Sequence, residues 1–264
     1  MTSQRSFFGA LRMWLLLALL AFVALGAWLE RRRSTDWDEP LRVTVYPVAA
    51  PGAAGAVADH LAQLGDPDFD AVETFLAEEA QAFGLALAEP VRVRVSHAAR
   101  EAPPALPERP SRLGIAAWSL RLRWWAWRVQ ANDPLPPPDI KVFAVHHPAD
   151  ARGPLPDSLG LAKGLTAIAH LYADPLAAGS NQVVLTHELL HTLGATDKYD
   201  RRSLQPLAPD GLGDPDRRPR YPQEYAEIMA GRIAVSANRA EIPTDLDQVT
   251  MGTATAREIG WLSR

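Results

Sequence analysis

The chain has 264 residues, of which 47% are hydrophobic and 22% are charged, and its formal net charge is −4. This balance is typical of a globular protein and shows no basic excess that would indicate nucleic acid as a partner. The chain contains no cysteine, which excludes disulfides, cysteine-ligated zinc and thiol catalysis.

An apolar run precedes the rest of the chain. Residues Met13–Leu29 form seventeen residues without a charge, with Trp14 and Trp28 near the two ends. A run of this length is at the short end for a spanning helix, and tryptophans are common at membrane interfaces. We therefore predict a membrane anchor or signal in residues 1–33, favouring an uncleaved single-pass anchor. Arginines on both sides leave the orientation undecided, and we expect the domain to lie outside the cytoplasm.

The next part of the chain alternates between strand and helix signals. We expect residues 34–40 to be a polar linker to one domain over residues 41–264. Leu41–Val48 and Val91–Val95 alternate apolar and polar residues, which predicts two strands. Between them, Ala49–Ala58 is rich in alanine and glycine and is expected to be a loop, whereas Asp66-Pro67 is typical of the start of a helix, which would run to Phe83.

A tryptophan-rich segment follows a proline-rich loop. Apolar residues recur at three- and four-residue steps over Gly114–Val129, which predicts a helix. The rest of this segment carries Trp124, Trp127 and two arginines. Two interpretations are open: a surface that lies against a membrane, or a core helix whose arginine stems cover exposed indoles. We favour the second.

Two further strands are expected before the most informative stretch. Ile140–Val145 and Gly164–Tyr172 have strand-like apolar patterns. His146 and His147 end the first of these strands, and without a third partner we expect them to be solvated rather than to bind a metal. His170, on the second strand, is expected to be a packing or rim residue.

The stretch Thr186–Tyr199 reads T-H-E-L-L-H-T-L-G-A-T-D-K-Y. His187 and His191 are four residues apart, so on a helix their imidazoles lie one turn apart on the same face and can bind one ion. Glu188 lies beside that face, where a carboxylate can take a proton from water. Gly194 comes where a helix end favours the left-handed conformation, and Asp197 is the next residue with a ligand oxygen.

Two histidines, one carboxylate and an open position describe a catalytic zinc site. We expect Ser180 or Asn181 to cap this helix, which would end near Leu193, and Leu185 and Leu189 to bury its back.

The motif H-E-x-x-H-x-x-G-x-x-D resembles that of the metzincin clan of zinc metallopeptidases, in the Asp-ended form similar to the snapalysin-type enzymes. The resemblance implies an α+β fold in which a mixed twisted sheet and the active-site helix form an α/β lobe over residues 41–194. A smaller, loop-rich lobe would cover residues 195–264. It implies that Gly164–Tyr172 is the edge strand that pairs with an extended peptide substrate, and that Glu188 is the catalytic base.

The clan also has a tight turn containing methionine beneath the metal, and Ile228-Met229-Ala230-Gly231 resembles that turn. Some clan members carry a tyrosine two residues after this methionine, where this chain has Gly231. A tyrosine that assists the oxyanion must therefore come from elsewhere, and Tyr199, Tyr221 and Tyr225 are candidates.

The resemblance predicts a zinc endopeptidase, and two alternatives stay open. In the first, Glu224 or Glu227 on a later helix is the third ligand, as in thermolysin-like peptidases. In the second, the chain is an inactive, membrane-tethered zinc-binding protein. Further on, Asp210–Asp216 is expected to be a solvated turn rather than a calcium site, and Thr253–Trp261 a short helix.

Overall fold

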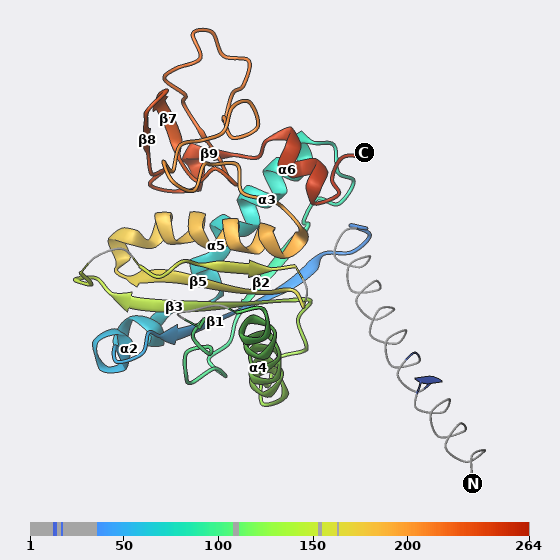
Figure 1. The fold of residues 1–264 in the computed structure, drawn as a ribbon, viewed down its shortest axis with the longest axis vertical. Coiled ribbons are helices and arrows are strands. Elements are labelled where there is room, and N and C mark those ends of the chain that lie inside the picture. Colours follow the sequence, from blue (N-terminus) through green and yellow to red (C-terminus); the bar gives the residue numbers. More distant parts are fainter. Residues whose placement is uncertain are drawn as a thin grey trace.

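The computed structural model describes residues 13, 14, 17, 36–107, 111–152, 155–162 and 164–263. Over these residues the chain is a mixed α+β protein whose five-stranded sheet has the order β2-β1-β3-β5-β4 (Figure 1). The four longer strands pair in parallel, and the short β4 is antiparallel to β5. The strands of this sheet are β1 Leu41–Ala49, β2 Val91–Val95, β3 Ile140–Pro148, β4 Leu159–Leu161 and β5 Thr166–Ala173.

The prediction of a membrane anchor in residues 1–33 is wrong. No helix in the described part of the chain is long and apolar enough to cross a membrane. The anchor had been placed in the seventeen-residue run Met13–Leu29. Most of this run lies outside the described residues. We therefore drop the single-pass anchor and the localisation that was inferred from it.

Helices cover both faces of the sheet (Figure 1). α3 and α5 pack on one face and α2 and α4 on the other, so two hydrophobic cores form, one on each side. Because both faces are covered, β3 is a nearly continuous buried run from Ile140 to His146. The helices are α2 Ala54–Gln63, η1 Asp66–Phe69, α3 Asp70–Ala82, α4 Arg112–Ala131, η2 Pro175–Ala177, α5 Ala178–Leu193, η3 Leu246–Gln248 and α6 Thr253–Glu258.

The chain beyond α5 forms a loop-rich region on the far side of this helix from the sheet (Figure 1). It contains two short two-stranded sheets, β6 with β9 and β7 with β8. Trp37, in the predicted polar linker, packs against this C-terminal region. Its side chain is buried, and its Nε1 donates to the Ile259 carbonyl oxygen at 2.8 Å. The short strands are β6 Ala226–Glu227, β7 Ile233–Ser236, β8 Arg239–Glu241 and β9 Val249–Thr250.

Three local predictions were wrong. The segment Ala49–Ala58, expected to be a loop, contains the first half of α2, which forms because Val57 is buried in the core below the sheet. Neither expected residue caps α5, since Asn181 instead binds both backbone groups of Tyr172 and ties the helix to β5. The outermost strand of the sheet is β4 and not β5, because β4 pairs with residues Thr166 to Ile168 of β5.

Candidate metal centre

Helix α5 places His187 and His191 on one face, beside the edge strand β4. Leu185 and Leu189 on its back are fully buried, which fixes the rotation of the helix. Gly194 ends the helix with a φ of +105°, a conformation that favours glycine. The chain reverses there and returns along the helix, which brings Asp197 to the two histidines, as predicted.

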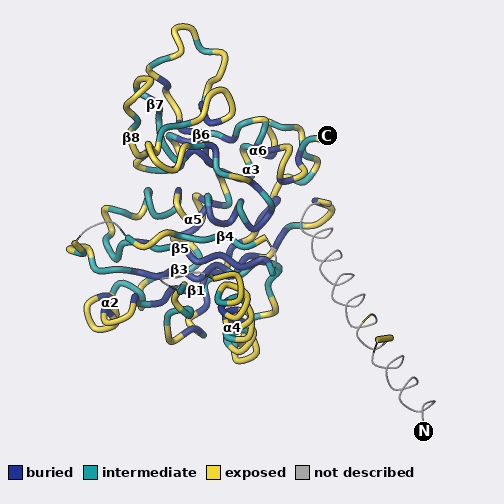
Figure 2. The backbone as a smooth tube through the Cα atoms, viewed as in Figure 1, coloured by how far each residue is buried: buried dark blue, intermediate teal, exposed yellow. Residues whose placement is uncertain are grey.

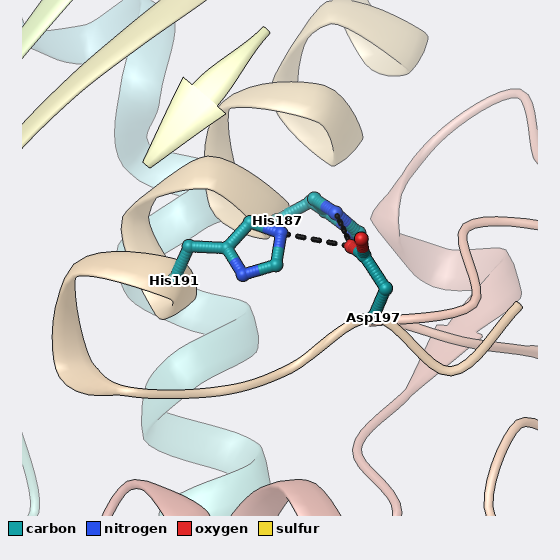
Figure 3. Close-up of side chains that lie close together, drawn as sticks. All are labelled: His187, His191 and Asp197. Carbon is teal, nitrogen blue, oxygen red and sulfur yellow. Dashed lines mark ion pairs between the residues drawn. The ribbon is translucent and has the colours of Figure 1, made fainter. Parts of the chain in front are cut away.

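The three side chains converge on one point (Figure 3). Asp197 Oδ1 lies 3.0 Å from His191 Nε2 and 3.4 Å from His187 Nε2. One ligand atom from each of the three residues lies within 4.8 Å of the other two. In the described part of the chain, this is the one group of three or more such side chains that could hold a metal ion. The separation suits three atoms that share one metal ion.

The other ring nitrogen of each histidine is held by the backbone. His187 Nδ1 donates to the Ile228 carbonyl oxygen at 2.9 Å, and His191 Nδ1 donates to the Ala195 carbonyl oxygen at 2.8 Å. These bonds assign the proton to Nδ1 and leave the Nε2 lone pair directed at Asp197. Carbonyl partners of this kind are typical of metal-ligating histidines.

Two buried oxygens support a bound cation at this site. Asp197 Oδ1 and Glu188 Oε2 are buried and have no hydrogen-bond partner. Buried polar atoms are usually satisfied, so an orphaned carboxylate oxygen beside two imidazole lone pairs fits an ion as the missing partner. The residues present therefore fit a divalent metal bound by two nitrogens and one oxygen.

Glu188 is a buried carboxylate beside the candidate ligands. Its side chain is buried next to the ligands but is not one of them. Burial raises the pKa of Glu188 to about 7, against the opposing effect of the His187 imidazole. A base with a pKa near the working pH both accepts and returns a proton efficiently. By contrast, the His187 imidazole and the Arg201 guanidinium lower the pKa of Asp197.

The turn at Ile228–Gly231 lies beneath the histidines. Met229 is fully buried, and Gly231 has a φ of +64°. The turn is held from inside by Glu227, whose carboxylate accepts hydrogen bonds from the backbone of Met229, Ala230 and Gly252 and from the Thr255 hydroxyl.

Neither alternative third ligand is placed to bind the metal. The Glu227 carboxylate is fully buried and its oxygens are occupied by the four hydrogen bonds of the turn. Glu224 is exposed and pairs with Arg217 at 3.3 Å. Neither residue lies on a helix: Glu227 is in β6, and Glu224 is in a loop.

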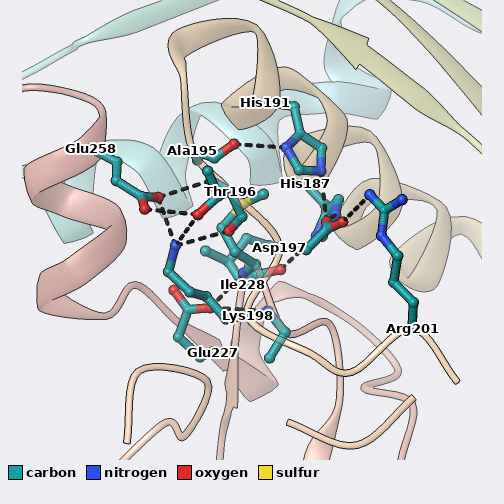
Figure 4. A network of polar contacts seen from close by, with 12 residues as sticks. His187, His191, Ala195, Thr196, Asp197, Lys198, Arg201, Glu227, Ile228 and Glu258 are labelled. Atoms are coloured by element: carbon teal, nitrogen blue, oxygen red, sulfur yellow. Dashed lines mark hydrogen bonds and ion pairs between the residues drawn. The ribbon is translucent and has the colours of Figure 1, made fainter. Parts of the chain in front are cut away.

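The loop that carries Asp197 is fastened on both sides of the ligand (Figure 4). Glu258 of α6 accepts hydrogen bonds from Thr196 N and Oγ1, both at 2.8 Å, and from Lys198 Nζ at 2.7 Å. Arg201 donates to the second Asp197 oxygen at 2.9 Å. We call Thr196, Lys198 and Glu258 the ligand-loop clasp. Sequence analysis missed it, because its partners are about sixty residues apart.

The metal centre opens into a cavity of about 900 Å³. Strand β4 forms one wall and comes so close to α5 that a Cβ at Gly160 would collide with His191 Cβ and the Glu188 carbonyl oxygen. Of the three candidate tyrosines, Tyr199 lines this cavity, and its ring centroid is 6.4 Å from that of His187. Tyr221 and Tyr225 are not among the lining residues.

Three further histidines, His146, His147 and His170, lie on the neighbouring strands β3 and β5. His146, expected to be solvated, is buried, and burial lowers its pKa to about 4. His147 and His170 share a hydrogen bond of 2.9 Å, and both line the cavity, where His170 had been expected to be a packing or rim residue. Asp157 and Ser158, which had no sequence signal, lie on the same wall.

Compared with protein-family models the chain matches none, and a search of curated proteins likewise finds no match. Assignment of a function therefore depends on the site itself.

Proposed function

We propose that this protein is a zinc-dependent metallopeptidase of the metzincin type, with Asp197 as the third ligand. The observation that carries the proposal is the convergence of His187, His191 and Asp197 beside a buried carboxylate, Glu188, that has a free oxygen. Two imidazoles and one carboxylate with an open position are the ligands of catalytic zinc. Structural zinc sites are usually closed by four protein ligands.

Zinc held by these residues would act as a Lewis acid and lower the pKa of water at the site. The residues of the chain supply the rest of the chemistry. Glu188 accepts a proton from the attacking water and delivers it to the leaving amine. Tyr199 lines the cavity beside His187 and is the candidate donor to the oxyanion. Arg201 keeps Asp197 ionised by holding its second oxygen.

The substrate that fits this site is an extended peptide. β4 is the terminal strand of the sheet and Leu159 and Gly160 line the cavity. An edge strand offers backbone N–H and C=O groups that can pair with another strand. A peptide added along β4 would pass directly over the metal ligands, because Gly160 packs on α5 between Glu188 and His191.

Three features support the metzincin type in particular. The motif helix ends at a left-handed glycine, the sheet has one antiparallel edge strand, and a buried methionine turn binds His187 through the Ile228 carbonyl. The glycine and the methionine turn are expected from the resemblance of the motif, which had, however, made Gly164–Tyr172 the edge strand.

The test compares metal content and peptidase activity in the full-length protein and three variants. We expect Asp197→Ala to lose zinc, and Glu188→Gln to keep zinc but lose turnover by about 10²-fold or more. Glu224→Ala is the matched control, an acidic residue removed from the exposed surface, and should retain both properties. A fully active Glu188→Gln protein would refute the mechanism. Zinc retained by Asp197→Ala would refute the ligand assignment.

A further inference from the structure

Helix α4 has a second apolar face that points into solvent. Trp118, Leu122 and Ala126 on its inner side are buried, as the core-helix interpretation predicts. On the outer side, however, large apolar residues are exposed: Leu113 by 84%, Leu120 by 69%, Trp124 by 56% and Trp127 by 62%. The outer side of α4 is accordingly drawn as exposed in Figure 2. The outer stripe, as we call it, consists of Leu113, Ala117, Leu120, Trp124, Trp127 and Ala131.

The spacing of the outer stripe is that of a helix–helix interface. Its members alternate between steps of four and three residues over the whole of α4. At about 100° per residue they fall within an arc of roughly 80°. A narrow seam with a period of 3.5 residues is the pattern of the a and d positions of a coiled coil. A helix that lies on a membrane usually has a broader apolar face.

The charges beside the stripe determine what kind of helix can bind. α4 contains no acidic residue, and its four arginines flank the stripe. Arg121 and Arg128 lie on one side, and Arg112 and Arg123 on the other. One of these arginines also contacts the outer stripe, since the Arg128 guanidinium lies 4.9 Å from the centroid of the Trp124 ring.

A second copy of α4 would not match this face. Positions e and g of paired coiled-coil helices face one another, so self-pairing would place arginine against arginine. Like charges across an interface oppose association, and opposite charges select the partner. The complementary surface is an apolar seam flanked by glutamate or aspartate.

We propose that the outer stripe of α4 is a docking site for an acidic amphipathic helix of a partner protein. The site is independent of the proposed peptidase chemistry: α4 and α5 lie on opposite faces of the sheet (Figure 1). The partner would lie along α4, burying both tryptophans and pairing its carboxylates with the arginines on either flank.

The test uses two synthetic helical peptides of about three heptads, with the same leucine seam and either glutamate or lysine at the flanking positions. Binding to the full-length protein is measured by fluorescence anisotropy of the labelled peptide. We expect the glutamate peptide to bind and the lysine peptide not to bind. Trp124→Gln with Trp127→Gln should weaken the binding about tenfold or more. The control Leu176→Gln, at a residue that is 95% exposed outside α4, should leave it unchanged.

A charge reversal gives a second, independent test. Arg121→Glu with Arg128→Glu leaves most of the seam in place and should abolish the preference for the glutamate peptide, because one flank is then acidic and the other stays basic. Equal binding of both peptides by the native protein would overturn the proposal. So would a dimer that the tryptophan substitutions dissociate, or tryptophan-dependent binding to vesicles of phosphatidylserine and phosphatidylcholine without a peptide preference. Circular dichroism confirms that each variant is folded.

Discussion

The ligand-loop clasp makes a quantitative prediction for the substitution Glu258→Ala. The Glu258 carboxylate is the acidic partner of Lys198, whose side chain is only 8% exposed. Without it the ammonium keeps two neutral partners, the Thr196 carbonyl oxygen at 2.9 Å and the Thr196 hydroxyl at 2.8 Å. The positive charge would then be buried without a compensating charge, next to the loop that carries Asp197.

The expected loss of stability follows from the burial of the pair. Breaking a fully buried ion pair by removing one partner costs about 3–5 kcal/mol. Because the Glu258 side chain is 31% exposed, water partly replaces it, and we expect a loss of about 2–3 kcal/mol. With a urea m-value of about 2–3 kcal/mol/M for a domain of this size, the midpoint of unfolding should fall by about 1 M.

Urea unfolding monitored by tryptophan fluorescence, on protein freed of metal with a chelator, measures this loss without the stabilisation that bound metal adds. Glu241→Ala is the control, because it breaks an ion pair with Arg239 that is 53% and 71% exposed and should cost about 0–1 kcal/mol. Adding Lys198→Met to Glu258→Ala removes the stranded charge and should restore part of the stability. A Glu258→Ala variant as stable as the control would refute this reasoning, as would a double variant that regains nothing.

Two further predictions concern the cavity wall and a buried histidine. Gly160→Ala should lower stability by about 1–3 kcal/mol and reduce zinc content, because its Cβ collides with α5; Gly55→Ala, where a Cβ meets nothing, should do neither. His146 has a folded-state pKa of about 4 against an ordinary 6.5, so the unfolded chain binds more protons between these values and stability is lost as pH falls through this window. Between pH 8 and pH 5 we expect a loss of about 2 kcal/mol that His146→Gln abolishes in urea unfolding, and an unchanged pH dependence in that variant would contradict the assignment.

The parts of the site that the sequence predicts are those encoded within a few residues. The four-residue spacing of His187 and His191 and the glycine at 194 specify a helix, its metal-binding face and its end. Asp197 follows because a chain reversing at Gly194 can reach the same face. The four longer strands of the sheet were predicted for the same reason, since their apolar patterns are local, whereas the short β4 was not predicted.

What could not be predicted depends on contacts between distant residues. The helical state of Ala54–Gln63 is fixed by burial of Val57 against the sheet rather than by its own pattern. Asn181 binds the backbone of Tyr172 instead of capping α5, and this choice is visible only when β5 lies beside the helix. Glu227 looks like a candidate ligand in the sequence, but in the fold its oxygens hold the methionine turn.

The position of Glu258 has a consequence for when the site can form during synthesis of the chain. Translation proceeds from the N-terminus, so His187, Glu188 and His191 leave the ribosome well before α6 does. Until α6 has emerged, the loop of Asp197 lacks its hydrogen bonds to Glu258, and the methionine turn lacks its bonds from Gly252 to Glu227 and from Thr255 to Glu227. A nascent chain is therefore expected to complete this site only once α6 has left the ribosome and packed against the loop.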